Sequence, residues 1–176
     1  FRSHANENAE LAANMIRTAC AKESINPGQM VLHSDNGGAQ KGATMLATLQ
    51  RLGVVPSFSR PRVSDDNPFS ESLFKTLKYS PQYPDAGFSS LEMAREWVEK
   101  FVDWYNNQHL HSGISWVTPA SRHQHQDTKI LNKRHLVYQE ARAKNPLRWS
   151  HKTRNWKREN IVELNPARRS KDINKL

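Results

Sequence analysis

The stretch "QMVLHSDNGG", residues 29–38, decides how this chain is expected to fold. Its apolar half is typical of a short buried strand, and Asp35 stands at the end of that strand, before two glycines. A helix-like stretch, "ATMLATLQRLG" at 43–53, and a second strand-like run, "VVPSFS" at 54–59, follow it. Strand, helix and strand in this order predict a parallel pair within an α/β sheet.

The remaining pattern is mostly helical. Apolar residues recur at helical spacing in five stretches, which we expect to form helices: 6–23, 43–53, 69–78, 89–108 and about 125–144. Asn6 or Asn8 is expected to cap the first helix, Gly53 to end the second, and Ser89 with Glu92 to form a capping box. Because two strands make a poor sheet, we expect the first strands of the sheet to lie outside this chain.

Charge is distributed unevenly along the 176 residues, whose formal net charge is +9. Residues 1–128 have a net charge of −1, whereas residues 129–176 have a net charge of +10. A basic segment of this kind suits contact with a polyanion such as DNA. A solvated tail that aids solubility is the alternative, and for a charge run alone it is the favoured one.

The composition also bears on compartment and class. The single cysteine, Cys20, excludes a disulfide framework within one chain and a cysteine-based zinc site, and it favours a reducing, cytoplasmic setting. No apolar run approaches the roughly 18 residues of a membrane span, so no membrane partner is expected.

Asp35 and Glu71 are the candidate catalytic residues, and 35 residues separate them. A carboxylate at a strand end and one on the next helix can converge at one edge of a parallel sheet. Two such carboxylates repel each other unless they share a proton or a cation, and hard cations such as Mg²⁺ take oxygen ligands. The alternatives are a turn aspartate and an exposed helix glutamate, each the more common explanation for one residue alone.

Two lysines share the helix face of Glu71. Lys75 and Lys78 follow Glu71 by four and seven residues, which places them on the same side of a helix. They are candidates for contacts with DNA phosphates beside a metal site. A surface Glu–Lys pair is the alternative, and it explains Lys75 better than Lys78.

Several motifs together resemble an integrase-type DDE transposase of bacterial insertion sequences, with the insertion sequence three family as the most similar group. They are "VLHSDNGG" at 31–38, "SDDNPFSESLFKTLK" at 64–78, "FVDWYNNQHLHSGISWVTPASRH" at 101–123, and "NPLRWSHKTRNW" at 145–156. The resemblance implies a ribonuclease-H-like integrase core and metal-dependent DNA strand cleavage and strand transfer. It also implies two Mg²⁺ or Mn²⁺ ions at three carboxylates, double-stranded DNA as partner, and a homo-oligomer on that DNA.

Carried over by position, Asp35 corresponds to the second aspartate of the family and Glu71 to its glutamate. Lys78 corresponds to a DNA-contacting basic residue of the family, and Asn67 belongs to the loop before the catalytic helix. His111 corresponds to the histidine of the "YN…H" stretch. The first aspartate is expected upstream of the chain. The resemblance therefore predicts a partial catalytic core at 1–122 and a basic helix with a DNA-contacting tail at 123–176.

Three further points were left open by the residues. His33 is a candidate to support Asp35, and a core histidine is equally plausible. In the tail, Trp149 and Trp156 are interleaved with five cationic residues that are predicted to contact DNA: Arg148, Lys152, Arg154, Lys157 and Arg158. The alternative is that the tail folds back and packs its tryptophans on the domain. The rival functions are a ribonuclease-H-like nuclease and a catalytically inactive DNA-binding remnant.

Overall fold

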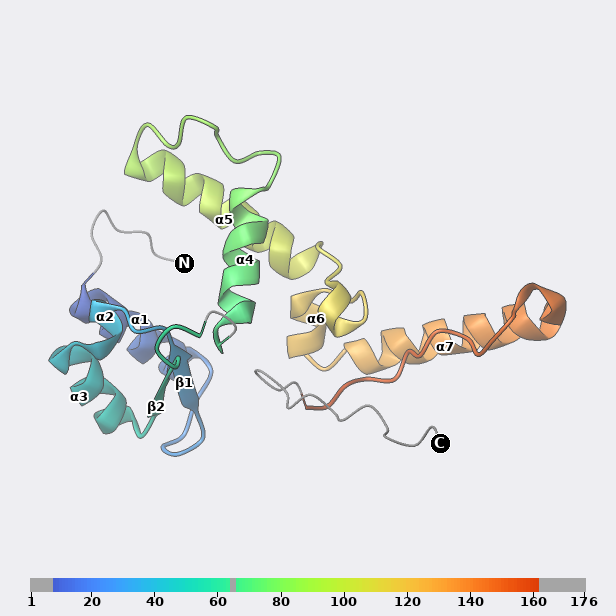
Figure 1. Cartoon of the computed structure of the whole chain (residues 1–176), viewed down its shortest axis with the longest axis horizontal. Coiled ribbons are helices and arrows are strands. Elements are labelled where there is room, and N and C mark those ends of the chain that lie inside the picture. Colours follow the sequence, from blue (N-terminus) through green and yellow to red (C-terminus); the bar gives the residue numbers. More distant parts are fainter. Residues whose placement is uncertain (1–7, 64–65, 162–176) are drawn as a thin grey trace. The chain divides into compact units, whose positions relative to one another are not determined.

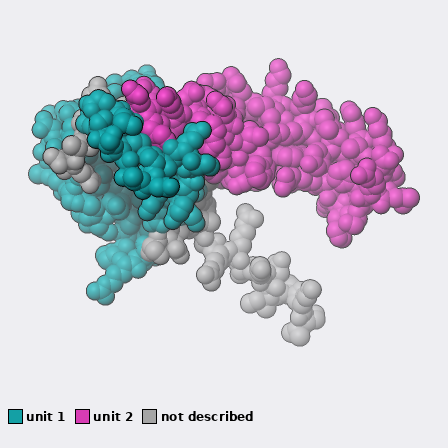
Figure 2. Space-filling view, turned by 90° about the horizontal axis from the view of Figure 1, so that it is seen from above, with its two compact units in different colours: residues 1–95, 163–176 teal, residues 96–162 magenta. Residues whose placement is uncertain are grey.

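A computed structural model describes residues 8–63 and 66–161, which form two compact units (Figures 1 and 2). Among these residues, the first unit extends to Arg95, and the second covers 96–161. This division falls within a helix and differs from the boundary predicted at residue 122.

The first unit is an α/β arrangement around two parallel strands. Val31 in the first strand is opposite Val55 in the second, and the register continues to Ser34 and Phe58, which confirms the predicted parallel pair. The described elements of this unit are α1 Ala9–Lys22, β1 Val31–Ser34, α2 Gly38–Lys41, α3 Ala43–Leu52, β2 Val55–Phe58 and α4 Pro68–Lys78.

The core of the first unit lies where α1 and α3 pack against each other. Its buried side chains come from both helices and from the residue that precedes β2, and Leu32 of β1 packs against them. They are Ala13, Ile16, Cys20, Met45, Leu49 and Val54. Side chains alternate across a strand, so His33, next to Leu32, is directed away from this core. Cys20 is a buried core residue.

The ends of the helices follow local chemistry. Asn8 caps α1, since its Oδ1 accepts the backbone N–H of Leu11 at 2.8 Å. Gly53 ends α3 at a φ of +64°, a conformation that glycine adopts without steric cost. The capping box predicted from Ser89 was wrong: the hydroxyl of Ser90 accepts the Met93 N–H at 3.2 Å.

The second unit is helical. Its elements are the greater part of α5 (Leu91–Asn107), η2 Ser112–Ile114, α6 Pro119–His123, α7 Asp127–Lys144 and η3 Pro146–Arg148. Its buried core consists of Val117, Leu131 and Trp156. After η3 the chain turns and runs back alongside α7 (Figure 1), and the Gln139 amide donates to the Thr153 hydroxyl at 3.2 Å.

This return course settles one alternative for the basic tail. Trp156 is 7% exposed, and its ring lies edge-on to Tyr138 with centroids 5.4 Å apart. The ring of Trp149 contacts Tyr138 as well. The described part of the tail, up to residue 161, therefore folds back and packs its tryptophans on the unit. None of the helices in the described part of the chain is both long and apolar enough to cross a membrane.

Candidate active site

Asp35 leaves β1 directly after Ser34 and is exposed. Its Oδ1 accepts the backbone N–H of Gly37 at 3.0 Å, an Asx turn that fixes the carboxylate. A Cβ at Gly37 would lie 3.1 Å from the same oxygen, closer than such atoms normally approach. Glycine therefore leaves room for the carboxylate, whose second oxygen accepts no hydrogen bond from a described residue.

Glu71 lies in the first turn of α4 and is exposed. The helix begins with Pro68, whose fixed φ suits a first helical position, and an acidic residue there is favoured by the helix dipole. Glu71 forms no ion pair with any described residue, Lys75 included. The alternative of a Glu–Lys surface pair thus receives no support from the described contacts.

Asp35 and Glu71 both line a cavity of about 490 Å³. Asp35 lines it from the end of β1, Glu71 from α4, and Asn67 from the position before α4. Its other lining residues are Asn36, Ser59, Arg60, Arg62, Val63, Ser70 and Phe74. Lys75 and Lys78 are exposed on α4 and do not line this cavity.

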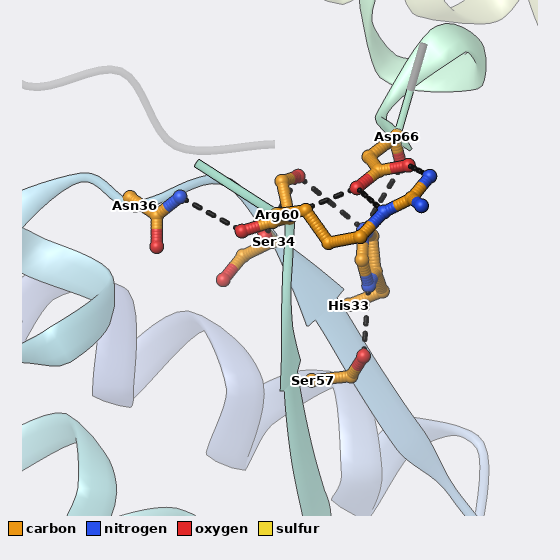
Figure 3. Close-up of polar contacts among 7 residues, drawn as sticks. His33, Ser34, Asn36, Ser57, Arg60 and Asp66 are labelled. Carbon is orange, nitrogen blue, oxygen red and sulfur yellow. Dashed lines mark hydrogen bonds and ion pairs between the residues drawn. The ribbon is translucent and has the colours of Figure 1, made fainter. Parts of the chain in front are cut away.

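His33 connects both strands to the segment that precedes α4 (Figure 3). Its Nε2 lies 2.9 Å from the backbone carbonyl oxygen of Asp66, and its Nδ1 lies 2.9 Å from the Ser57 hydroxyl. A carbonyl oxygen only accepts, so Nε2 is the donor in its contact with Asp66. The imidazole thereby fixes the start of α4 to the sheet.

Asp66 makes the second connection in this loop, and it was not among the predicted site residues. Asp66 is 6% exposed, and its carboxylate accepts from Arg60 three times: from the backbone N–H at 2.8 Å, from Nε at 3.0 Å and from Nη2 at 2.8 Å. The hydrogen bonds and charge of Asp66 raise the pKa of Arg60. An arginine six residues before an aspartate within a loop is the one sequence feature that could have indicated this pair.

The donor set of the cavity suits one hard cation. Two carboxylates and the Asn67 amide are oxygen donors of the type that Mg²⁺ takes, often one or two carboxylates with water and phosphate completing the shell. Within residues 8–63 and 66–161, however, no three His, Cys, Asp or Glu side chains are grouped so as to hold a metal ion. The described residues therefore fit part of a metal site, short of the three carboxylates expected for two ions.

The basic residues of the tail have different surroundings. Arg158 donates from Nε to the buried Asp127 at 2.8 Å, and the guanidinium of Arg154 lies over the Trp156 ring at 5.4 Å. Arg148 borders a cavity of about 260 Å³ beside Trp149, while Lys152 and Lys157 are exposed. Arg154 and Arg158 thus have contacts within the unit that the sequence did not predict.

His111, the other predicted supporting histidine, lies in the second unit. Its Nδ1 accepts the Gly113 N–H at 3.1 Å, and its ring meets those of Tyr105 and His109 edge-on. Burial, and then the charge of His109, lower the pKa of His111. Its described contacts are those of a capping residue for η2.

The fold and the cavity together define an α/β unit with an acidic site at the carboxyl end of a parallel strand pair. Residues 52–119 match the integrase core domain family, a range that includes Glu71. The chain is 32% identical over 111 residues to the transposase for insertion sequence element IS904 of Lactococcus lactis, covering 62% of this chain and 43% of that protein. It is 30% identical over 110 residues to the InsK protein for element IS150 of Escherichia coli, covering 62% and 38%.

These comparisons confirm the resemblance found in the sequence: the chain is similar to transposases of bacterial insertion sequences, and its residues 52–119 match the integrase core domain family. The matched region spans less than half the length of either relative.

Proposed function

We propose that this chain contributes the Asp35–Glu71 part of a ribonuclease-H-like active site that cleaves DNA strands and transfers them during transposition. The observation that carries the proposal is the cavity that both carboxylates line, although 35 residues separate them in the sequence. The relation to insertion-sequence transposases supports the choice of DNA as substrate.

Asp35 and Glu71 would hold Mg²⁺ or Mn²⁺, with Asn67 beside them. A divalent cation bound there supplies Lewis-acid stabilisation of the charge that develops on phosphoryl oxygens. The chain's own residues position the ligands. The Gly37 N–H fixes one oxygen of Asp35. The hydrogen bond between His33 and the Asp66 carbonyl fixes the loop before α4, the helix that carries Glu71.

Double-stranded DNA is the proposed partner, with homo-oligomers forming on it. Lys75 and Lys78 are exposed on the helix that carries Glu71, and lysines there can neutralise phosphates next to the reacting strand. In the second unit, Arg148, Lys152 and Lys157 are exposed and remain the better placed of the predicted tail contacts.

The test is a Mn²⁺ titration of the chain followed by the electron paramagnetic resonance signal of the free ion. Asp35→Asn and Glu71→Gln should each weaken Mn²⁺ binding at least about tenfold, since even residues that support metal ligands contribute 10–100-fold. Glu92→Gln is the matched control, because Glu92 is an exposed carboxylate in the first turn of α5. Equal Mn²⁺ affinity in all three variants and the intact chain would overturn the proposal.

Strand transfer and hydrolysis are separated by their products. A labelled duplex incubated with the chain, Mn²⁺ and unlabelled target DNA gives labelled products longer than the substrate if strands are transferred. Shorter products alone indicate a nuclease. A catalytically inactive DNA-binding remnant, which the lack of a three-ligand group among the described residues favours, predicts salt-sensitive DNA binding that survives Glu71→Gln and needs no metal.

A further inference from the structure

Arg62 is the cavity residue that the proposed metal site does not use. It is exposed, lines the same cavity as Asp35 and Glu71, and has a φ of +62°. Residues other than glycine adopt this left-handed conformation at a cost, and such positions cluster at functional sites. Among the described residues, none forms a hydrogen bond or ion pair with its guanidinium.

Arg60, two residues earlier, provides the contrast within the same cavity. Its guanidinium is held by both oxygens of the Asp66 carboxylate, at 3.0 Å and 2.8 Å, so its charge is matched and its orientation fixed. The Arg60–Asp66 pair therefore fixes the loop that carries Arg62. Of the two arginines at the cavity, Arg62 is the one whose guanidinium has no hydrogen-bond partner among the described residues.

We propose that Arg62 binds a phosphodiester oxygen of double-stranded DNA at the cavity that Asp35 and Glu71 line. This inference rests on the proposed function, because it assigns a further DNA contact to the same site. A cation bound by Asp35 and Glu71 offsets their two negative charges, which leaves Arg62 to attract a phosphate. Arginine suits that task, since its planar guanidinium donates two parallel hydrogen bonds to phosphate.

Fluorescence anisotropy of a labelled 20-base-pair duplex tests the contact in the intact chain. Each neutralised phosphate adds about 0.9 to the slope of log affinity against log salt concentration. Arg62→Ala should therefore reduce the slope by about 0.9 and weaken binding roughly eightfold at 0.1 M salt. The matched control is Arg51→Ala, because Arg51 is an exposed cation of α3 in the same unit that does not line the cavity.

A second variant separates DNA contact from loop conformation. Arg62→Gly removes the guanidinium but accepts the positive φ without strain, so the loop keeps its course. It should weaken DNA binding as much as Arg62→Ala, whereas Mn²⁺ affinity measured without DNA should stay that of the intact chain.

The outcomes divide clearly. A loss in both Arg62 variants, with Arg51→Ala unchanged, supports the contact. Equal DNA affinity in the intact chain and the Arg62 variants, or an equal loss in Arg51→Ala, overturns it, as does failure of the intact chain to bind DNA. The two proposals can fail separately. If the intact chain binds DNA through Arg62 but has the same Mn²⁺ affinity as Asp35→Asn, only the proposed metal site is overturned.

Discussion

Replacing Asp127 should loosen the basic tail from the second unit. The Asp127 carboxylate is fully buried, and its Oδ2 accepts from Arg122 at 2.6 Å and from Arg158 at 2.8 Å. Hydrogen bonds to charged groups contribute about 1.5–3 kcal/mol each. Because the two arginine side chains are 20% and 28% exposed, solvent screening reduces the sum. We expect Asp127→Ala to lower the free energy of unfolding of this unit by about 3 kcal/mol.

Asp127→Asn separates charge from hydrogen bonding. Its side-chain oxygen can still accept from Arg122 and Arg158, while its amide takes the place of Oδ1, which has no hydrogen-bond partner in the described structure. The loss should therefore be smaller, about 1–2 kcal/mol. Glu140→Gln is the control, because Glu140 is an exposed acidic residue of the same helix, α7.

Urea unfolding followed by tryptophan fluorescence measures this unit alone, because all five tryptophans lie between residues 96 and 162. The expected order of unfolding midpoints is intact chain and Glu140→Gln highest, Asp127→Asn lower, and Asp127→Ala lowest. Coincident midpoints for the intact chain and Asp127→Ala would refute the reasoning, since the buried ion pair would then contribute nothing.

The same carboxylate gives the second unit an acid dependence. Burial raises the pKa of Asp127, but hydrogen bonds and charge from Arg122 and Arg158 outweigh burial and lower the pKa below its ordinary 3.8. A depressed carboxylate pKa stabilises the folded state above the unfolded value, and this contribution is lost as pH falls through the folded pKa. The extra stability of the intact chain over Asp127→Asn should therefore be full above about pH 4 and shrink below it.

Four other substitutions, at three positions, test the packing and the site. Trp156→Ala should cost the second unit about 3–5 kcal/mol in urea unfolding, and Trp156→Phe less, because the indole Nε1 has no hydrogen-bond partner among the described residues. His33→Ala should weaken Mn²⁺ binding about tenfold in the titration with the free-ion signal, because it releases the segment before Glu71. Gly53→Ala should lower the stability of the first unit by about 2–4 kcal/mol in thermal unfolding followed by circular dichroism, since its Cβ would lie 2.6 Å from Pro27 Cβ at a φ of +64°.

Much of the first unit could be predicted because its signals are local. The apolar run before Asp35 and the helical spacing of 43–53 are sufficient to place β1 and α3, and strand–helix–strand order predicts parallel pairing. Gly53 was predictable as a helix end for the same reason, since left-handed backbone at that point favours glycine. Asp35 and Glu71 line one cavity, and their joint role as metal ligands there stays a prediction.

The second unit was harder to predict because its contacts join residues far apart in sequence. Composition showed a basic tail, but it could not show that Arg158 would pair with Asp127, 31 residues earlier. Helix α7 has little segregation of apolar from polar residues along its length, and Leu131 is its one buried apolar side chain. Its partner is Trp156, from the segment expected to contact DNA.

The position of Glu71 depends on the loop before α4 more than on the packing of the helix itself. No residue of α4 is buried, and the apolar side chains of Phe69 and Phe74 are largely exposed. What fixes the start of the helix is Asp66, through its carbonyl to His33 and its carboxylate to Arg60. A change at Asp66 therefore acts on the carboxylate pair without touching either carboxylate, and it acts through two bonds that a local sequence pattern does not reveal.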